Sequence, residues 1–211
     1  HGMTSGELAR MSNASGWMKS RCQLHVVPMQ GWQRWMAWEH TGLRWVPTSP
    51  NIPHARSPFY YVATGILGSL HGPDIGIGTS GPFEYAGGKG VNADEFSGAL
   101  RRLNTPGVTF SPYQSTKKPG WAGARISIDP RTTADLVALD IVLIDELNRR
   151  IRGDYFDSTP ASAMNIFYKV YGSTELEHAL GRGISTGNII ASWKGANDYF
   201  RRQRQVHLMY G

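Results

Sequence analysis

Apolar residues spaced three or four positions apart predict several helices in this chain. Near the start, Leu8 and Met11 share one helical face, and Thr4 or Ser5 can cap a helix over residues 3–15. Glu7 stands three residues after Thr4, which is the spacing of a capping box. Further helices are predicted over residues 59–70, 92–104, 132–152, 161–171 and 185–204, with Asn92 and either Thr132 or Thr133 as caps. The helix over 132–152 is apolar on a broad face, so we expect it to be largely buried.

Alternating apolar and polar residues predict short strands between these helices. The predicted strands cover residues 22–27, 75–78, 82–86, 108–113 and 124–128, and the first of them ends at Pro28. The chain therefore opens with a helix and a strand, as the last αβ unit of an α/β domain does. We expect an α+β fold, with a mixed α/β domain over 59–211 preceded by the terminal piece of another domain over 1–30.

A segment rich in tryptophan and proline, residues 31–58, separates these two predicted domains. It contains Trp32, Trp35, Trp38 and Trp45, followed by Pro47, Pro50, Pro53 and Pro58. Proline at this density excludes a regular helix. Loops of this length are usually functional or disordered, and the tryptophans argue against disorder. We expect a structured crossover between two domains.

Composition narrows the classes of partner. The chain has 211 residues, 40% of them hydrophobic, which is enough for one sizeable core. A net charge of +6 favours an acidic partner such as a carboxylate-rich polymer, or serves solubility alone. The basic residues form short clusters without a nucleic-acid-binding motif, and no apolar run is long enough to span a membrane, so we expect neither nucleic-acid binding nor a membrane span. Cys22, the only cysteine, is expected to be a small buried hydrophobe.

The crossover also carries side chains suited to sugar recognition. Indole rings stack on the C–H faces of sugars, so Trp32 is a candidate, although the tryptophans could equally pack two domains together. Arg34 and Arg44 could hold a sugar carboxylate in a bidentate pair. Ser49 and Asn51 lie among prolines that stiffen the chain, and they serve either sugar hydroxyls or a local turn.

Glycosidases usually need two carboxyl groups, and here no pair stands out by spacing. The candidates away from helix surfaces are Glu7, Glu39, Asp74 and Glu84. Glu84 lies among aromatic residues on a predicted strand, whereas Glu7 is better placed to cap its helix. The histidines lack the spacing of metal ligands, and the glycines of 76–81 lack the lysine of a phosphate-binding loop. We expect no metal and no cofactor.

Three motifs in order resemble one family. They read HGMTSGELA at 1–9, VPMQGWQR at 27–34 and TGLRWVPTSPNIP at 41–53. Further segments follow in the order found in that family: YVATGILG at 61–68, GIGT at 76–79, PFE at 82–84 and LNTPGV at 103–108. They resemble the NamZ-type exo-β-N-acetylmuramidases of bacteria, and the resemblance covers most of the chain, as the C-terminal half of such a protein.

The resemblance implies a Rossmann-like first domain, a smaller α+β second domain and an active site between them. It implies exo-acting release of N-acetylmuramic acid from peptidoglycan fragments, by a protein that is secreted, periplasmic or associated with the cell envelope. This chain begins inside a loop, so we expect an upstream domain that carries a catalytic acid. The residues expected to line the active site are Glu84 and His1 as catalytic groups, and Trp32, Arg34, Ser49, Asn51, Tyr61 and Thr79 as substrate-binding groups.

Departures from the family pattern, of which a third lies near Gly87-Gly88-Lys89, leave alternatives open. Gly68-Ser69-Leu70-His71 stands where many relatives carry a glutamate, and Ile77 stands where some carry arginine. The first alternative is therefore a non-catalytic glycan-binding module of the cell wall. The second, which rests on the expectation that the chain is incomplete, is a subunit of a larger assembly.

Overall fold

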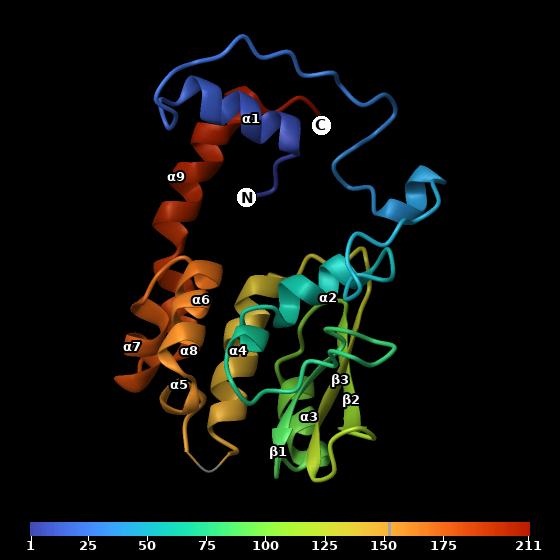
Figure 1. Ribbon diagram of the computed structural model, residues 1–211, viewed down its shortest axis with the longest axis vertical. Coiled ribbons are helices and arrows are strands. Elements are labelled where there is room, and N and C mark those ends of the chain that lie inside the picture. The colour runs from blue at the N-terminus through green and yellow to red at the C-terminus, as the bar shows by residue number, and fades with distance from the viewer. Residues whose placement is uncertain (152) are drawn as a thin grey trace. The chain divides into compact units, whose positions relative to one another are not determined.

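A computed structural model describes residues 1–151 and 153–211. Its contacts divide the chain into two compact units. Unit 1 joins the two ends of the chain, residues 1–43 and 191–211, and unit 2 comprises residues 44–190. Figure 1 traces both units from the blue N-terminus to the red C-terminus. The fold is α+β, as expected, since helices accompany a small antiparallel sheet.

Unit 1 is built around α1 (Ser5–Ala14) and the C-terminal stretch of the chain. Thr4 caps α1, and the predicted capping box is present, because the Thr4 Oγ1 and the Glu7 carboxylate each accept a hydrogen bond from the other residue's backbone N–H. The short 3-10 helix η3 (Gln205–His207), which follows α9 (Lys194–Arg204), packs against α1. In Figure 1 the blue and red ends of the chain lie together here. The crossover contributes one short 3-10 helix, η1 (Trp38–Thr41).

Unit 2 contains an antiparallel sheet in the order β1-β3-β2. The strands are β1 (Tyr85–Lys89), β2 (Val108–Gln114) and β3 (Trp121–Ile128). Alternation sets the two faces of the sheet. One face buries residues such as Phe110, Ala124 and Ile126, whereas Tyr85, Tyr113 and Arg125 lie on the other, outer face.

Helices cover the buried face of the sheet. α3 (Ala93–Arg102) packs on β2 and β3 through Phe96 and Leu100, which are completely buried. α4 (Leu136–Asn148) packs against α2 (Ser57–Thr64), and its apolar residues are buried, as predicted. The remaining elements are η2 (Leu67–Ser69), α5 (Tyr155–Ser158), α6 (Ala161–Tyr171), α7 (Glu175–Gly181) and α8 (Thr186–Ser192), the last of which crosses the sequence boundary between the units.

A buried carboxylate joins α4 to the start of η2. Asp140 has no exposed surface, and its two carboxylate oxygens accept hydrogen bonds from the backbone N–H groups of Ile66 and Leu67, at 2.8 and 3.0 Å. These groups are unpaired donors at the beginning of a helical turn, which a side-chain acceptor usually satisfies. Burial raises the pKa of Asp140 to about 7, although the two hydrogen bonds oppose that rise.

Several sequence predictions were wrong in detail. Residues 22–27 form no strand, because an extended segment becomes a strand only where a neighbour supplies backbone hydrogen bonds, and they have no strand partner among the described residues. Residues 75–78 form no strand, since Ile77 and Gly78 lie in a turn, and the strand predicted at 82–86 begins only at Tyr85. Cys22 is exposed rather than buried.

Helix boundaries also differ from prediction. The helix expected over 59–70 is divided into α2, which ends at Thr64, and the short η2. The helix expected from Thr132 or Thr133 starts at Leu136, because the Asp135 carboxylate caps it by accepting from the N–H groups of Val137 and Ala138. Its predicted end, residue 152, lies outside the described residues. The helix expected over 185–204 is divided into α8 and α9. In the part of the chain that the structure describes, no helix combines the length and apolar character needed to cross a bilayer.

Candidate functional site

The outer face of the sheet carries two stacked aromatic rings. Tyr85 of β1 and Tyr113 of β2 stack with ring centroids 4.1 Å apart, across the intervening strand β3. Between them, Gly87 and Gly123 are register partners on β1 and β3. A Cβ atom at Gly123 would overlap the backbone of Ala86 and Gly87, so glycine is required for this close approach of strands. The absence of side chains there leaves room for the two rings.

An ion pair extends this aromatic surface. Arg125 of β3 donates to the Glu84 carboxylate at 3.0 Å, and its guanidinium lies 5.9 Å from the centre of the Tyr85 ring. The hydrogen bond to Glu84 raises the pKa of Arg125, so its charge is secure. Glu84 is therefore held in place beside an aromatic ring and a permanent cation.

A second ion pair lies at the other side of the rings. Asp74 is nearly fully buried, yet its carboxylate lies 3.5 Å from the Lys118 ammonium and 3.5 Å from the Tyr113 hydroxyl. Lys118 also lies 4.5 Å from the centre of the Trp121 ring. Burial and the nearby Asp74 charge raise the pKa of Tyr113, so it remains a neutral phenol. We name the whole set the aromatic–ionic strip: Asp74, Glu84, Tyr85, Tyr113, Lys118, Trp121 and Arg125.

The loop that leads to Glu84 is held rigidly. Phe83 has a φ angle of 70°, which residues other than glycine rarely adopt. Its N–H donates to the Ile75 carbonyl at 2.6 Å, and its own carbonyl accepts from the buried Thr64 hydroxyl at 3.0 Å. Strained backbone that is fixed by surrounding bonds is frequent at functional sites. The strained residue, Phe83, immediately precedes Glu84, the carboxylate that was predicted from the sequence to be catalytic.

Thr79 and Tyr61, both expected to bind substrate, lie near this loop. The Thr79 hydroxyl donates to the Gly76 carbonyl at 2.7 Å and accepts from the Gly81 N–H at 3.1 Å, so it braces the turn. Tyr61 is half exposed and packs edge-on against Phe83 at 4.9 Å. The Thr79 hydroxyl is thus used within the turn, whereas the Tyr61 ring keeps exposed surface that a ligand could contact.

Arg34, expected to bind a sugar carboxylate, is paired with the carboxylate of Glu7 in this structure. Its guanidinium donates to Glu7 at 2.7 Å, to the Gly2 carbonyl at 2.8 Å and to the Tyr210 carbonyl at 3.3 Å. The Met209 N–H also donates to Glu7, at 2.7 Å. Burial alone would raise the pKa of Glu7, but the hydrogen bonds and the Arg34 charge lower it to about 2.

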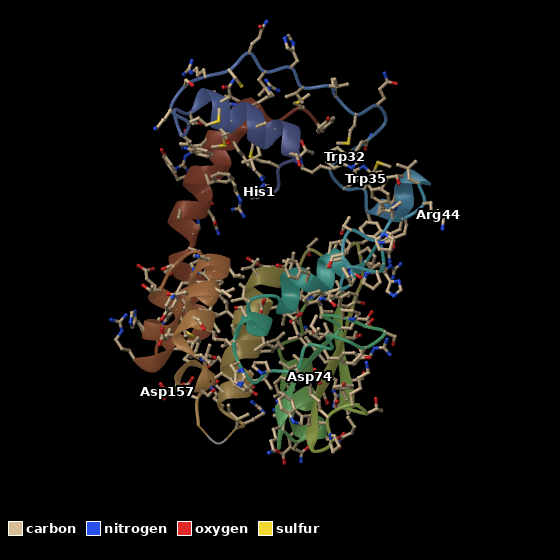
Figure 2. All side chains as sticks on the ribbon, in the orientation of Figure 1. His1, Trp32, Trp35, Arg44, Asp74 and Asp157 are labelled. Atoms are coloured by element: carbon tan, nitrogen blue, oxygen red, sulfur yellow. The ribbon has the colours of Figure 1, made fainter. Side chains whose placement is uncertain are left out.

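His1 and Trp32 belong to the same part of unit 1. His1 is exposed, and its Nδ1 accepts a hydrogen bond from the Met3 N–H at 3.2 Å, while Arg204 donates to its carbonyl. Trp32 is half-buried and contacts Tyr210 edge-on at 4.9 Å, so it packs against the C-terminal stretch. Figure 2 labels His1, Trp32 and the more exposed Trp35.

Ser49 and Asn51 form a local turn, which is one of the two roles that the sequence allowed. The Ser49 Oγ accepts from the Asn51 N–H at 3.2 Å, and the Ser49 carbonyl accepts from the Ile52 N–H at 2.9 Å. The Trp45 indole donates to the Ile52 carbonyl at 3.3 Å. Arg44, exposed and labelled in Figure 2, lies in the same segment.

Of the predicted site residues, unit 2 brings together those around Glu84. Tyr61 contacts Phe83, the residue before Glu84, and the turn braced by Thr79 leads into that residue. His1, Trp32 and Arg34 belong to unit 1. The described residues hold no cluster of three or more histidine, cysteine or acidic side chains arranged to bind a metal.

Sequence reasoning missed most of the aromatic–ionic strip. Asp74 was among the carboxylates considered, but Arg125, Tyr85 and Tyr113 were not singled out. Their outward position follows from the alternation within each strand. Their meeting depends on the strand order β1-β3-β2 and on the register Tyr85↔Arg125, neither of which a periodic pattern specifies.

The chain matches two family models. Residues 1–56 match the N-terminal model of exo-β-N-acetylmuramidase NamZ, and residues 59–210 match its C-terminal model. It is 32% identical to the peptidoglycan β-N-acetylmuramidase NamZ of Bacillus subtilis, over all of this chain and 50% of that protein. The chain thus spans about half the length of this relative.

Solved structures show the same fold. A crystal structure of a DUF1343 family protein from Bacteroides fragilis matches 99% of this chain and 56% of its own, with a TM-score of 0.87 and 32% identity. A second protein of that family and organism matches the whole chain with a TM-score of 0.62 and 20% identity, which supports the fold alone. Together with the family models, these matches show that the chain belongs to the NamZ family of exo-β-N-acetylmuramidases.

Proposed function

We propose that this chain is part of an exo-acting β-N-acetylmuramidase that removes N-acetylmuramic acid from peptidoglycan fragments, and that it forms one side of the active site. The observation that carries the proposal is its 32% identity, along its whole length, with the B. subtilis peptidoglycan β-N-acetylmuramidase. The aromatic–ionic strip supports it, because its side chains match the chemistry of a sugar that bears a carboxylate.

Each part of the strip has a role in this proposal. The rings of Tyr85 and Tyr113 offer apolar surface on which a pyranose can rest, as aromatic side chains do in sugar-binding proteins. Arg125 attracts the lactyl carboxylate of muramic acid, because a guanidinium can bind a carboxylate in a bidentate pair. Glu84, held beside Arg125, is the carboxyl group that would exchange a proton with the substrate.

The test is release of the sugar by the natural protein. A chromogenic glycoside of N-acetylmuramic acid should be hydrolysed, whereas the matching glycoside of N-acetylglucosamine, which lacks the lactyl carboxylate, should not. Failure to release the chromophore from the muramic acid glycoside would overturn the enzymatic proposal. Equal hydrolysis of both glycosides would show that the lactyl carboxylate is not recognised, which would contradict the role proposed for Arg125.

A second candidate is a non-catalytic module that binds cell-wall glycans. It is favoured by one observation: both carboxylates of the strip are already paired with cations, Glu84 with Arg125 and Asp74 with Lys118. Sedimentation with purified peptidoglycan, without release of sugars, would support this candidate over the enzyme. Sedimentation with release would support the enzyme.

The substrate class leads to a proposed location and process. A protein that acts on peptidoglycan meets its substrate at the cell envelope, so we extend the proposal to a secreted, periplasmic or envelope-associated protein of a bacterium that takes part in cell-wall recycling. Fractionation of cells, with the protein detected by antibody in each fraction, tests the location. Recovery only with the cytoplasm would contradict it.

A further inference from the structure

Unit 2 contains a pocket of about 810 Å³ that is separate from the outer faces of the Tyr85 and Tyr113 rings. It lies where the end of β1, the residues after η2, the C-terminal end of α4 and the short helix α5 meet. Figure 1 shows α5 beside the lower part of α4, and Figure 2 labels Asp157 of α5. Its volume is in the range of pockets that hold small molecules. The described residues that line it are His71, Gly72, Lys89, Gly90, Trp121, Arg150, Ile151, Gly153, Asp154, Tyr155, Asp157 and Ser158.

Two of the charged residues lining this pocket are already committed to the fold. The Asp154 carboxylate caps α5 by accepting from the Phe156 N–H at 2.7 Å, and it also accepts from the Asn148 amide at 3.2 Å. Arg150 pairs with Glu146 at 2.6 Å. These two side chains are therefore largely satisfied without a ligand.

Lys89 and Asp157 are the remaining opposite charges. Both are exposed, and neither side chain makes a hydrogen bond or an ion pair with any residue in the ranges 1–151 and 153–211. A purely anionic ligand would leave Asp157 without a counterpart, and a purely cationic ligand would leave Lys89 without one. A ligand with a carboxylate and an ammonium group would satisfy both at once.

The walls of the pocket suit the apolar part of a small molecule rather than a sugar ring. Tyr155 is almost fully buried, and Ile151 adds aliphatic surface. Trp121 also lines the pocket, but Lys118 lies over its ring at 4.5 Å, so the surface that a sugar would use for stacking is partly taken. This pocket therefore differs in chemistry from the stacked rings of the aromatic–ionic strip.

The Tyr155 hydroxyl gives a further indication that this wall is specialised. It is buried and forms no hydrogen bond with any described group. A buried hydroxyl without a partner has lost its hydrogen bonds to water and gained none in return, so such groups are rare in folded proteins. A Cβ atom at Gly72 would crowd the Tyr155 ring, and a Cβ atom at Gly88 would overlap the Tyr155 hydroxyl, so both positions require glycine.

We propose that this pocket, in which the Lys89 and Asp157 side chains have no partner among the described residues, binds a zwitterionic amino acid or short peptide with an apolar side chain. Lys89 binds the carboxylate, Asp157 binds the ammonium group, and Tyr155 with Ile151 contacts the side chain. This inference does not depend on the proposed glycosidase activity, because it concerns another set of charges and another class of ligand.

The experiment uses a series of probes in which the two charges lie progressively further apart: leucine, alanyl-leucine and alanyl-alanyl-leucine. Each is titrated into the isotope-labelled chain, and binding is followed by shifts of the Gly90 and Gly153 amides and of the Trp121 indole N–H in two-dimensional NMR spectra. At least one probe should bind at millimolar or lower concentration. If none of the three shifts these signals, the proposal is wrong.

Blocked probes and variants then separate the two charges. For the probe that binds best, acetylation of the amine or amidation of the carboxylate should each weaken binding by about tenfold or more, the effect of losing one charge-assisted contact. Lys89→Met should weaken binding of the zwitterion but not of the amidated probe. Asp157→Asn should weaken binding of the zwitterion but not of the acetylated probe.

Matched controls are an exposed lysine and an exposed glutamate outside the pocket, Lys117→Met and Glu95→Gln, neither of which should change binding. Spectra of all four variants should keep the dispersion of the parent chain, which shows that they fold. Equal binding of the blocked and unblocked probes would overturn the proposal. So would equal effects of the pocket and control variants.

Discussion

The guanidinium of Arg34 donates to the buried carboxylate of Glu7 at 2.7 Å, and this pair joins three segments of unit 1. Glu7 belongs to α1, Arg34 belongs to the tryptophan-rich crossover, and both bond to the C-terminal stretch, through the Met209 N–H and the Tyr210 carbonyl. Glu7 has no exposed surface, whereas Arg34 is 28% exposed. A carboxylate buried in this way depends on its partners, because an unpaired buried charge is costly.

Replacement of Arg34 by methionine should therefore destabilise unit 1. Methionine keeps the aliphatic stem but leaves Glu7 with only its backbone donors, so we expect a loss of about 2–3 kcal/mol. Native-state hydrogen exchange of the α1 amides measures it. The matched control is Arg131→Met, because Arg131 pairs with the exposed Asp129 at 2.9 Å and exposed pairs contribute at most about 1 kcal/mol. Equal losses of stability in the two variants would show that the contribution of the Arg34–Glu7 pair does not depend on the burial of Glu7.

The same carboxylate should make unit 1 sensitive to acid. The pKa of Glu7 falls from 4.5 to about 2 in the folded chain, so its contribution is complete above pH 4.5 and is lost as the pH falls towards 2. The shift corresponds to about 3 kcal/mol. Unfolding of unit 1, followed at a series of pH values between these limits, should become easier as the pH falls. The Glu7→Gln variant should be less stable than the parent chain over this pH range, but its free energy of unfolding should depend less on pH.

Asp140 should produce the opposite slope in unit 2. Its pKa is raised from 3.8 to about 7, so the folded state binds a proton that the unfolded state has released. The stability linked to this group is therefore greatest below pH 3.8 and is lost as the pH rises to about 7. Urea unfolding of unit 2 measures the slope. Asp140→Asn should remove it, although one of the two backbone N–H groups at η2 would lose its acceptor, while the exposed Asp94→Asn should leave it unchanged. A parent chain whose unit 2 is equally stable at pH 3.8 and at pH 7 would contradict the prediction.

The two acids also show what local sequence can reveal. The capping box of Glu7 was predicted from its distance to Thr4, because a cap is an interaction over three residues. Its bond to Arg34 spans 27 positions, and the bond from Asp140 to Ile66 spans 74. Asp140 sits within an apolar helix pattern, where sequence gives no indication of a distant acceptor role. Long-range polar contacts of this kind depend on the fold.

The secondary structure was predictable for similar reasons. α3 and α6 have clear periodicity and ended within a few residues of their predicted bounds. Residues 22–27 alternate as a strand should, but alternation gives only the propensity, and pairing depends on a neighbour. For the candidate site, Glu84 was singled out by its aromatic surroundings, whereas Arg125 and Tyr113 become its neighbours only through the register of three strands.

The proposed activity makes Glu84 and Arg125 separable by mutation. Glu84→Gln keeps the shape and the contact with Arg125 but cannot exchange a proton, so kcat on a muramic acid glycoside should fall by about 100-fold or more. Arg125→Met keeps the carboxylate and removes its cation, so it should mainly raise KM for the muramic acid substrate. Activity assays on the natural protein with both variants measure the difference. Nearly normal kcat in Glu84→Gln would exclude it as the acid or base.

The last prediction concerns Gly88 and the hydroxyl of Tyr155. A Cβ atom at position 88 would overlap the hydroxyl oxygen but would lie 3.5 Å from the ring carbon that bears it, an ordinary contact distance. Gly88→Ala should therefore destabilise unit 2 by about 1–3 kcal/mol through overpacking. Tyr155→Phe should be neutral or stabilising, because the hydroxyl has no described partner.

Combining the two substitutions should recover most of the loss, with a coupling of roughly 1 kcal/mol or more between neighbouring sites. Urea unfolding of the parent chain, the two single variants and the double variant measures this coupling. Gly98→Ala is the control, since a Cβ atom there meets nothing closer than 3.7 Å and alanine favours the helix. If Tyr155→Phe does not relieve Gly88→Ala, some group other than the hydroxyl opposes a side chain at position 88, and the buried hydroxyl is not what requires glycine in this strand.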